Sequence, residues 1–398
     1  MGAVRLPSPA YTQQEKTHPV AADALRAVAI GMVGWFHIWQ QSWQGAGQWT
    51  YLARTGAVWV DGMILLSAFC LFLPRAAAWA EHQPDPGMDV ADFYKKRAIR
   101  ILPSYNVLLL TSLTVTLLTA GGGPWLWRDL AAHLTFTHAW FVETSIGTQL
   151  GSATWTLSLF AWFYLAFPLV AKAMYRRPLA TGLAFFAVQA VWRSTTEPLY
   201  GTLDYNMRFN QLPAFASTLA LGMWGAMAFS ALIRSPQLAH WWARILCTLG
   251  GCAALWRVDG LLRDLNYSRD YQLWQLQNRT PLVSWMLLAL VLLALGLPLP
   301  GARFWAFLSG ISYNFYLWHQ TLTVWVKYHL HLPFWQGDAP PNQLGDTVWM
   351  AKSNLLYWAA ALAAAVAMTY LVEKPCVRIY KNHSKKPNNC GTQAQKVV

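Results

Sequence analysis

Charged residues are scarce in this chain of 398 residues. Asp, Glu, Lys and Arg make up 12% of it, whereas 55% of its residues are hydrophobic. A typical soluble protein is about 25% charged, so the balance argues against both a soluble enzyme and a disordered chain. The 24 tryptophans, many at the ends of apolar runs, suit a membrane–water interface. The composition therefore predicts a protein that crosses a membrane several times.

Cysteines are also few, and their spacing does not indicate a disulfide or a metal site. Cys70, Cys247 and Cys252 fall within apolar runs, and Cys376 and Cys390 lie in the C-terminal part. This arrangement is neither a disulfide framework nor a set of zinc ligands. We therefore expect no metal.

The apolar runs predict an all-α membrane protein, a bundle of about ten transmembrane helices. A helix needs about 20 mostly apolar residues to cross the bilayer core, and continuous runs exclude the alternating strands of a barrel. Lys and Arg are enriched in cytoplasmic segments. With the N-terminus placed inside, 19 of them fall on the inner side and 10 on the outer side, so both termini are expected in the cytoplasm. The ten runs are 24–41, 55–75, 101–120, 153–172, 179–195, 212–233, 241–257, 281–299, 304–327 and 353–372.

The segments between the runs are short and polar. Residues 75–100 are expected to form the main cytoplasmic loop, and 258–280 an outer loop. Segments 121–152 and 329–350 are rich in Gly, Pro and Asn and are expected outside, above a cavity. In domain terms, we expect a cytoplasmic N-terminal segment, a transmembrane domain and a flexible basic tail, at 1–22, 23–375 and 376–398.

The net charge of +13 is explained by anchoring at the inner membrane surface, since basic residues are dispersed among short loops. A nucleic-acid-binding protein would gather them on one soluble surface. The expected partner is the lipid bilayer of a cell membrane, such as a bacterial inner membrane, and no nucleic acid.

Polar groups inside spans are costly and mark function by default. Arg26 and His37 lie eleven residues apart in the first span. Eleven residues come within about 20° of three full helical turns and rise about 16 Å, so both side chains point to one face. Asp23 shares that face and is positioned to pair with Arg26. The alternative is a histidine that is only a hydrogen-bonded part of the structure.

Two arginines, Arg97 and Arg100, stand at a membrane boundary, three residues apart on one helical surface. Two guanidinium groups there suit a phosphorylated ligand that approaches from the cytoplasm. Positive-inside anchoring explains them equally well.

Other polar residues have weaker cases. Asp61 and His319 lie inside the second and ninth runs, where each is either functional or a hydrogen-bonding group between helices. His133, His138 and Glu143 fall in an outer segment, where a solvated surface position is expected.

Taken in order, the motifs resemble the acyltransferase 3 family of membrane proteins, which acylate sugars, polysaccharides and some macrolides. The resemblance spans about 23–375 and rests on six blocks together. These are Asp23-Ala-Leu-Arg-Ala-Val-Ala-Ile with His37; Val60-Asp to Ser67-Ala-Phe; Phe93 to Pro103 with Arg-x-x-Arg; Trp155-Thr-Leu with Phe163-Tyr-Leu-Ala-Phe-Pro168; Gly310-Ile-Ser-Tyr to Trp318-His-Gln; and Glu373-Lys-Pro.

The resemblance implies a ten-helix bundle and an acyl-CoA donor, most often acetyl-CoA. His37 would match the family's catalytic histidine and Arg26 its partner, while Arg97 and Arg100 would match the arginine pair on the CoA side. A hydroxyl acceptor on a glycan or small molecule would be activated by His37 as general base, or acylated through an acyl-His37 intermediate. Candidate donors to the developing oxyanion are Trp155, His319 and Tyr313.

One position departs from the family pattern. Where the fourth-span block usually carries a glutamate, this chain has Phe160, which can neither accept a proton nor orient a histidine. We expect Asp61 or Asp23 to supply the missing acid if the enzyme is active. Ala68, where the family often has glycine, is a minor departure.

The sequence thus predicts a membrane-embedded O-acyltransferase that would act in O-acetylation or polysaccharide modification. Two alternatives remain: an inactive family member, motivated by Phe160, and a transporter-like glycan-binding membrane protein. The transporter reading would be favoured by inverted repeats with broken helices.

Overall fold

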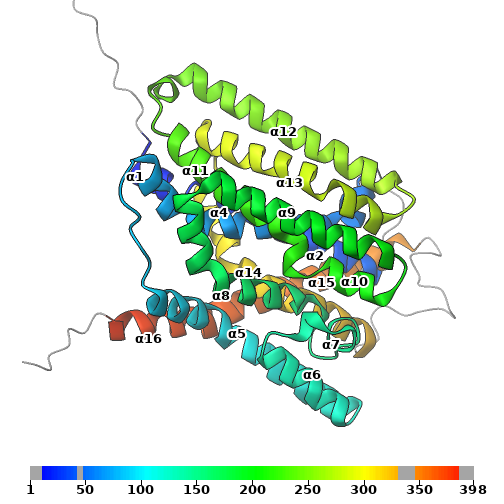
Figure 1. The fold of residues 1–398 in the computed structure, drawn as a ribbon. Coiled ribbons are helices and arrows are strands. Elements are labelled where there is room, and N and C mark those ends of the chain that lie inside the picture. Colours follow the sequence, from blue (N-terminus) through cyan, green and yellow to red (C-terminus); the bar gives the residue numbers. More distant parts are fainter. Residues whose placement is uncertain (1–10, 43–47, 330–345, 385–398) are drawn as a thin grey trace, which may run out of the picture.

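The protein is a bundle of long helices, seen here in a computed structural model that describes residues 11–42, 48–329 and 346–384 (Figure 1). The described residues contain no strand. Each of the ten predicted runs falls on a long helix. These are α2 (Val20–Ser42), α4 (Trp59–Ala80), α5 (Val90–Thr119), α8 (Trp155–Arg176), α9 (Pro178–Thr196), α11 (Ala216–Leu232), α12 (Trp241–Tyr267), α13 (Tyr271–Leu295), α14 (Ala302–His329) and α15 (Thr347–Met368).

Length and apolar composition qualify eight segments of the described chain as membrane-crossing helices, which makes this an all-α membrane protein. Helices α9 and α14 are not among the eight, and α14 carries several of the polar motif residues in its interior. The eight are Val20–Gln41, Gly56–Ala80, Val90–Thr119, Trp155–Arg176, Leu212–Leu232, Trp241–Tyr267, Tyr271–Leu295 and Thr347–Asn382.

The centre of the bundle is formed by α2, α4, α11 and α14. Helix α4 packs along α11, and α2 packs along both α4 and α14. A Cβ on Gly222 would come within 2.5 Å of the carbonyl oxygen of Leu65 and 2.8 Å of the Cβ of Ala68, so only glycine allows this approach of α11 to α4. Helix α12 and the C-terminal span are the least buried of the eight, as expected of helices that face lipid.

Several expected loops are helical. The chain between α4 and α5 is reduced to 81–89, because both helices extend beyond the apolar core. Likewise, 258–280 is not a loop: α12 and α13 fill it apart from a turn at 268–270. The N-cap of α13 is Asp270, whose side chain accepts a hydrogen bond from the backbone N–H of Leu273.

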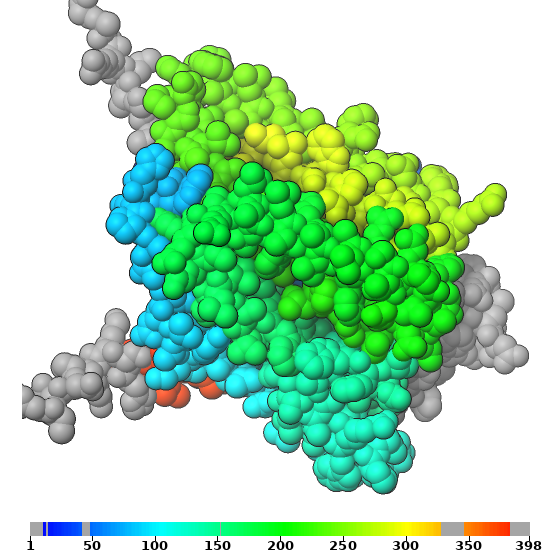
Figure 2. Space-filling model, viewed as in Figure 1, coloured from blue at the N-terminus to red at the C-terminus, as the bar shows by residue number. Residues whose placement is uncertain are grey.

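The segment at 121–152, which is predicted to lie outside, folds into a cap of short helices, here called the outer cap: α6 (Pro124–Leu134), η2 (His138–Trp140) and α7 (Val142–Ser145). It stands at the lower right of the molecule in Figure 2, below the green surface of the α9–α10 region. The remaining short helices are α1 (Gln13–Thr17), α3 (Thr50–Arg54) and α10 (Leu203–Phe209). Of the other predicted outer segment, 329–350, residues 330–345 lie outside the described residues.

The C-terminal part begins as helix rather than as a flexible tail. A π-helical turn, η8 (Thr369–Glu373), leads from α15 into α16 (Lys374–Ser384), which is anchored to α5 by a hydrogen bond from the Tyr380 hydroxyl to Asp92. Residues 385–398 lie outside the described residues. In Figure 1, α1, α16 and the α4–α5 connection lie at the same end of the bundle, which is the end predicted to face the cytoplasm.

Candidate active site

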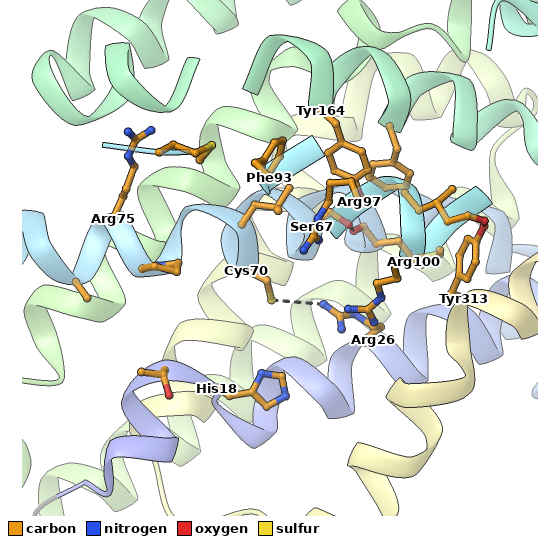
Figure 3. Close-up of a pocket in the computed structure, with 18 of the residues that line it drawn as sticks. His18, Arg26, Ser67, Cys70, Arg75, Phe93, Arg97, Arg100, Tyr164 and Tyr313 are labelled. Carbon is orange, nitrogen blue, oxygen red and sulfur yellow. Dashed lines mark hydrogen bonds between the residues drawn. The ribbon is translucent and has the colours of Figure 1, made fainter. Parts of the chain in front are cut away.

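A cavity of about 980 Å³ opens at that end of the bundle (Figure 3). Its lining holds six basic side chains and one acidic side chain, Glu81. Helices α2, α4, α5, α8 and α14 all contribute to its wall. The basic residues are Lys16, Arg26, Arg75, Arg97, Arg100 and Arg234.

Three of the arginines are the ones predicted from the sequence. Arg26 from α2 and Arg97 and Arg100 from α5 gather on one side of the cavity in Figure 3. The Arg26 guanidinium donates to the Ser309 hydroxyl at 3.3 Å and contacts the Cys70 sulfur at 3.4 Å. Asp23, which was expected to pair with Arg26, is instead bonded to His18 at 2.9 Å.

Arg97 and Arg100 differ in how much of their charge is balanced. The Nε atom of Arg97 is buried and has no hydrogen-bond partner among the described residues, and its guanidinium lies 5.8 Å from the centre of the Phe93 ring. Arg100 pairs at 3.7 Å with Glu373, at the end of the π-helical turn. Glu373 is fixed in turn by a hydrogen bond from Asn314. Among the described residues neither Arg26 nor Arg97 forms an ion pair, so an anion entering the cavity would find two guanidinium groups available.

Two further basic residues of the cavity lining already have acidic partners. Arg75 pairs with Asp85 at 3.1 Å, and Arg234 pairs with Glu81. The N-terminal His18, beside Asp23, has its pKa raised chiefly by the hydrogen bond to that carboxylate. His18 therefore gains positive charge more readily than a free histidine.

The predicted catalytic histidine, His37, is joined to His319. Their rings face each other across α2 and α14, with the Nδ1 atom of His37 2.8 Å from the Nε2 atom of His319. The chain separates these residues by 282 positions, so this pairing is a product of the fold. His319 is fully buried, and His37 is partly buried.

The tautomers of both histidines follow from their partners. The Nδ1 atom of His319 lies 2.8 Å and 3.1 Å from the carbonyl oxygens of Tyr316 and Phe315, and a carbonyl oxygen only accepts, so this Nδ1 carries the proton. In the neutral ring, Nε2 of His319 is then an acceptor, and His37 must donate to it from Nδ1. The remaining nitrogen of His37, Nε2, is left with its lone pair. That is the form a general base requires.

This arrangement changes the part expected of His319. Both of its ring nitrogens are engaged, so in this form it does not donate to an oxyanion but holds the ring of His37. Tyr313, another oxyanion candidate, donates its hydroxyl proton to the carbonyl oxygen of Ile101. Trp155 stacks on Phe215 with ring centres 5.9 Å apart and does not line the cavity, although the next residue, Thr156, does.

Asp61 lies elsewhere in the bundle. It is fully buried, forms an ion pair with Arg279 at 2.9 Å and accepts a hydrogen bond from Gln275 at 3.1 Å. The Arg279 guanidinium lies between the rings of Phe209 and Phe215, 4.4 Å and 4.0 Å from their centres. These contacts join α4 to α13, and they favour the structural interpretation of Asp61 over substitution for the missing glutamate.

Phe160, at the position of the family's glutamate, lines the cavity and stacks on Tyr164 with ring centres 5.9 Å apart. It therefore gives the cavity an apolar wall close to the arginines of α5. His37 obtains its orienting partner from His319 instead. Ser67, Cys70 and Tyr164 also line the cavity, and their position in or beside the second- and fourth-span motifs is the signal in the sequence that could have identified them.

His133 and His138 are buried rather than solvated. They are 0% and 1% exposed, and their rings stack with centres 4.1 Å apart. His133 is also within 3.1 Å of the Asp129 carboxylate, and His138 donates from Nε2 to the carbonyl oxygen of Thr154. The two histidines thus hold the outer cap onto the start of α8, and Glu143 lies in the short helix α7 of that cap.

Comparison with known proteins identifies the family. Residues 20–374 match the profile of the acyltransferase domain of the acyltransferase 3 family. The chain belongs to this family. The protein is accordingly an acyltransferase and an integral membrane protein with several spans.

Two relatives have acyltransferase names. ORF330 of Acidianus two-tailed virus, which carries an acetyltransferase name, is 23% identical over 78% of this chain and 84% of its own length. The acyltransferase MdmB of Streptomyces mycarofaciens is 25% identical over 41% of this chain, a match that spans 42% of MdmB. No solved structure matches the chain.

Proposed function

We propose that this acyltransferase takes an acyl group, acetyl in the first instance, from acyl-CoA and transfers it to a hydroxyl of a glycan or other small acceptor. The observation that carries the proposal is the pairing of a cationic cavity with a histidine whose free Nε2 has a lone pair. Arg26, Arg97 and Arg100 would bind the phosphates of the donor. Arginine suits this part because its planar group binds phosphate oxygens through two parallel hydrogen bonds.

The transfer itself needs one base and one leaving group. Nε2 of His37 would take the proton of the acceptor hydroxyl while the hydroxyl oxygen attacks the carbonyl carbon of the thioester. The carbon–sulfur bond then breaks, and the proton passes from the imidazolium to the CoA sulfur. His319 would stabilise the imidazolium by accepting the hydrogen bond from Nδ1 of His37.

The distances within α2 suit a long donor. Arg26 and His37 are separated by about 16 Å along the helix axis, so a donor with phosphates at Arg26 needs an extended arm to bring its thioester to His37. The pantetheine arm of CoA is such a linker. An inactive family member would not need arginines without ion pairs in its cavity or a hydrogen-bonded histidine pair, so both features favour an active enzyme.

Donor binding can be tested separately from chemistry. The double variant Arg97→Lys/Arg100→Lys retains charge but loses the planar guanidinium groups, so we expect CoA to bind about tenfold or more weakly. The measurement is calorimetric titration of CoA into purified protein in nanodiscs. Lys172→Arg, a basic change on α8 outside the cavity lining, is the matched control and should bind CoA as the native protein does.

Two results would contradict the assignment of these arginines. Unchanged CoA affinity in the double variant would reduce Arg97 and Arg100 to membrane anchors. Equal binding of CoA and of pantetheine, which lacks the nucleotide phosphates, would show that the cavity does not recognise phosphate. Transfer is then measured with radiolabelled acetyl-CoA and a crude glycan extract.

A further inference from the structure

Two hydrogen-bonded hydroxyl side chains form part of the cavity wall. Thr156 of α8 and Tyr316 of α14 both line the cavity, and both are buried, at 1% and 4% exposure. His37 and His319 do not line it. The side chains of Thr156 and Tyr316 therefore form the part of the wall nearest to the histidine pair along α14.

The Tyr316 hydroxyl makes two hydrogen bonds. It accepts one from the Thr156 hydroxyl at 2.8 Å and donates one to the carbonyl oxygen of Ala153 at 2.5 Å. Thr156 is in the first turn of α8 and Ala153 lies in the 3-10 turn just before it, η3 (Ser152–Thr154), while Tyr316 is in the middle of α14. The ring is thus held across the gap between the two helices.

The same residue is in direct contact with His319, the hydrogen-bonding partner of His37. The ring centre of Tyr316 lies 5.7 Å from that of His319, and its carbonyl oxygen accepts the Nδ1 proton of His319. Tyr316 therefore presents its side chain to the cavity and its backbone to the histidine pair. A displacement of the side chain would leave in place the backbone contact that sets the tautomer.

We propose that Tyr316, latched by Thr156, is the gate that separates the donor cavity from His37. The inference rests on the proposed function, because it assumes that acyl-CoA occupies the cavity. In the latched arrangement the thioester stays on the cavity side of the ring. Release of the latch admits the acyl group to His37.

A gate at this point has a chemical purpose. Water is a competing nucleophile for any thioester that reaches a histidine base, and exclusion of water protects reactive groups from hydrolysis. In that side reaction the oxygen of water bonds to the acyl carbon, the carbon–sulfur bond breaks, and the proton taken by His37 passes to the CoA sulfur. The products are a carboxylic acid and free CoA, so the leak can be measured without knowing the acceptor.

The test is the release of CoA from acetyl-CoA by protein in nanodiscs with no acceptor added. Tyr316→Ala removes the ring, whereas Tyr316→Phe and Thr156→Val remove only hydroxyl contacts of the latch. We expect release to rise about tenfold in Tyr316→Ala and severalfold in the two milder variants, since one lost hydrogen bond changes an opening equilibrium by about that factor. Adding His37→Ala to Tyr316→Ala should abolish the rise.

The matched control is Tyr105→Phe, which removes another buried tyrosine hydroxyl, bonded to the carbonyl oxygen of His133 and outside the cavity lining. It should release CoA at the native rate. If all the Tyr316 and Thr156 variants bind CoA like the native protein and release it no faster, the gate is wrong while the proposed function stands. If the native protein does not bind CoA at all, both fall. Tyr316→Phe and Thr156→Val keep the test decisive if Tyr316→Ala does not fold.

Discussion

At the residue scale, the two histidines show what a single sequence reveals and what it does not. His37 and His319 were both identifiable as polar groups inside apolar runs, because such groups are expensive in a bilayer. Their hydrogen bond depends on the rotation and depth of α2 against α14, which no local pattern encodes. The sequence pointed to Asp61 or Asp23 as the acid for His37 and did not indicate that the His319 imidazole lies beside it.

The orienting role of His319 predicts different outcomes for two substitutions. His319→Leu removes the acceptor for Nδ1 of His37, so kcat should fall by about 10- to 100-fold, the worth of a hydrogen bond to a group that becomes charged. His319→Gln places an amide oxygen near the former Nε2 position and should recover part of the loss. The measurement is the pH profile of turnover, in which the acidic limb, where protonation removes His37 as a base, should move in His319→Leu.

CoA affinity serves as the control for these variants. It should be unchanged in both, because His319 does not line the cavity. If the glutamine and leucine variants lose activity equally and with the native pH profile, His319 acts only through packing.

At the element scale, helices were located well and their ends poorly. All ten predicted runs coincide with helices, since about 20 apolar residues leave little choice of structure in a bilayer. The loops at 75–100 and 258–280 were overestimated, because hydropathy marks where the bilayer ends and not where the helix ends. Arg279 was thus assigned to an outer loop, although it is the buried partner of Asp61.

The ion pair between α4 and α13 predicts an effect on stability rather than on chemistry. Asp61→Asn would leave Arg279 buried without its counter-charge, a change that costs about 3–5 kcal/mol. We expect a markedly lower melting temperature for Asp61→Asn but native turnover per folded molecule. Replacing both residues with leucine should restore much of the stability, and a loss of turnover in folded Asp61→Asn would return Asp61 to the catalytic site.

The outer cap predicts a pH dependence of stability. Burial, with a contribution from the neighbouring His133, lowers the pKa of His138 to about 4, below the value of about 6.5 for an exposed histidine. The unfolded chain therefore binds a proton at this residue between about pH 6.5 and pH 4 that the folded chain does not. Above about pH 6.5 the histidine is neutral in both the folded and the unfolded chain. As the pH drops from about 6.5 to about 4, the free energy of unfolding decreases.

The measurement is the melting temperature at pH 7.5 and at pH 5. The free energy of unfolding of the native protein should be about 1–2 kcal/mol smaller at pH 5, since one pKa unit corresponds to about 1.4 kcal/mol. Its melting temperature should fall accordingly. His138→Gln, which has an amide nitrogen to donate to Thr154 and does not titrate, should lose less. Equal losses in both proteins would show that His138 does not govern the acid sensitivity of the cap.

At the scale of the whole molecule, motifs far apart in the chain meet around one cavity. Arg26, Arg97 and Arg100 line it together with Phe160 and Tyr313, and Glu373 of the last motif pairs with Arg100. The sequence indicated these blocks through their order and their costly residues. It did not indicate that Asp61 and Trp155 would be absent from the cavity lining while Tyr316 would be part of it, because those outcomes depend on the packing of α4, α8, α13 and α14.

The central claim is that one molecule binds acyl-CoA at the arginines and uses His37 for the transfer. Its most direct test is transfer of radiolabelled acetyl groups by the native protein and by His37→Ala in nanodiscs, with CoA affinity measured on the same samples. The account predicts equal CoA affinity and at least about 100-fold slower transfer by His37→Ala, the typical contribution of a general base. Transfer at the native rate by a folded His37→Ala protein that binds CoA normally would contradict it.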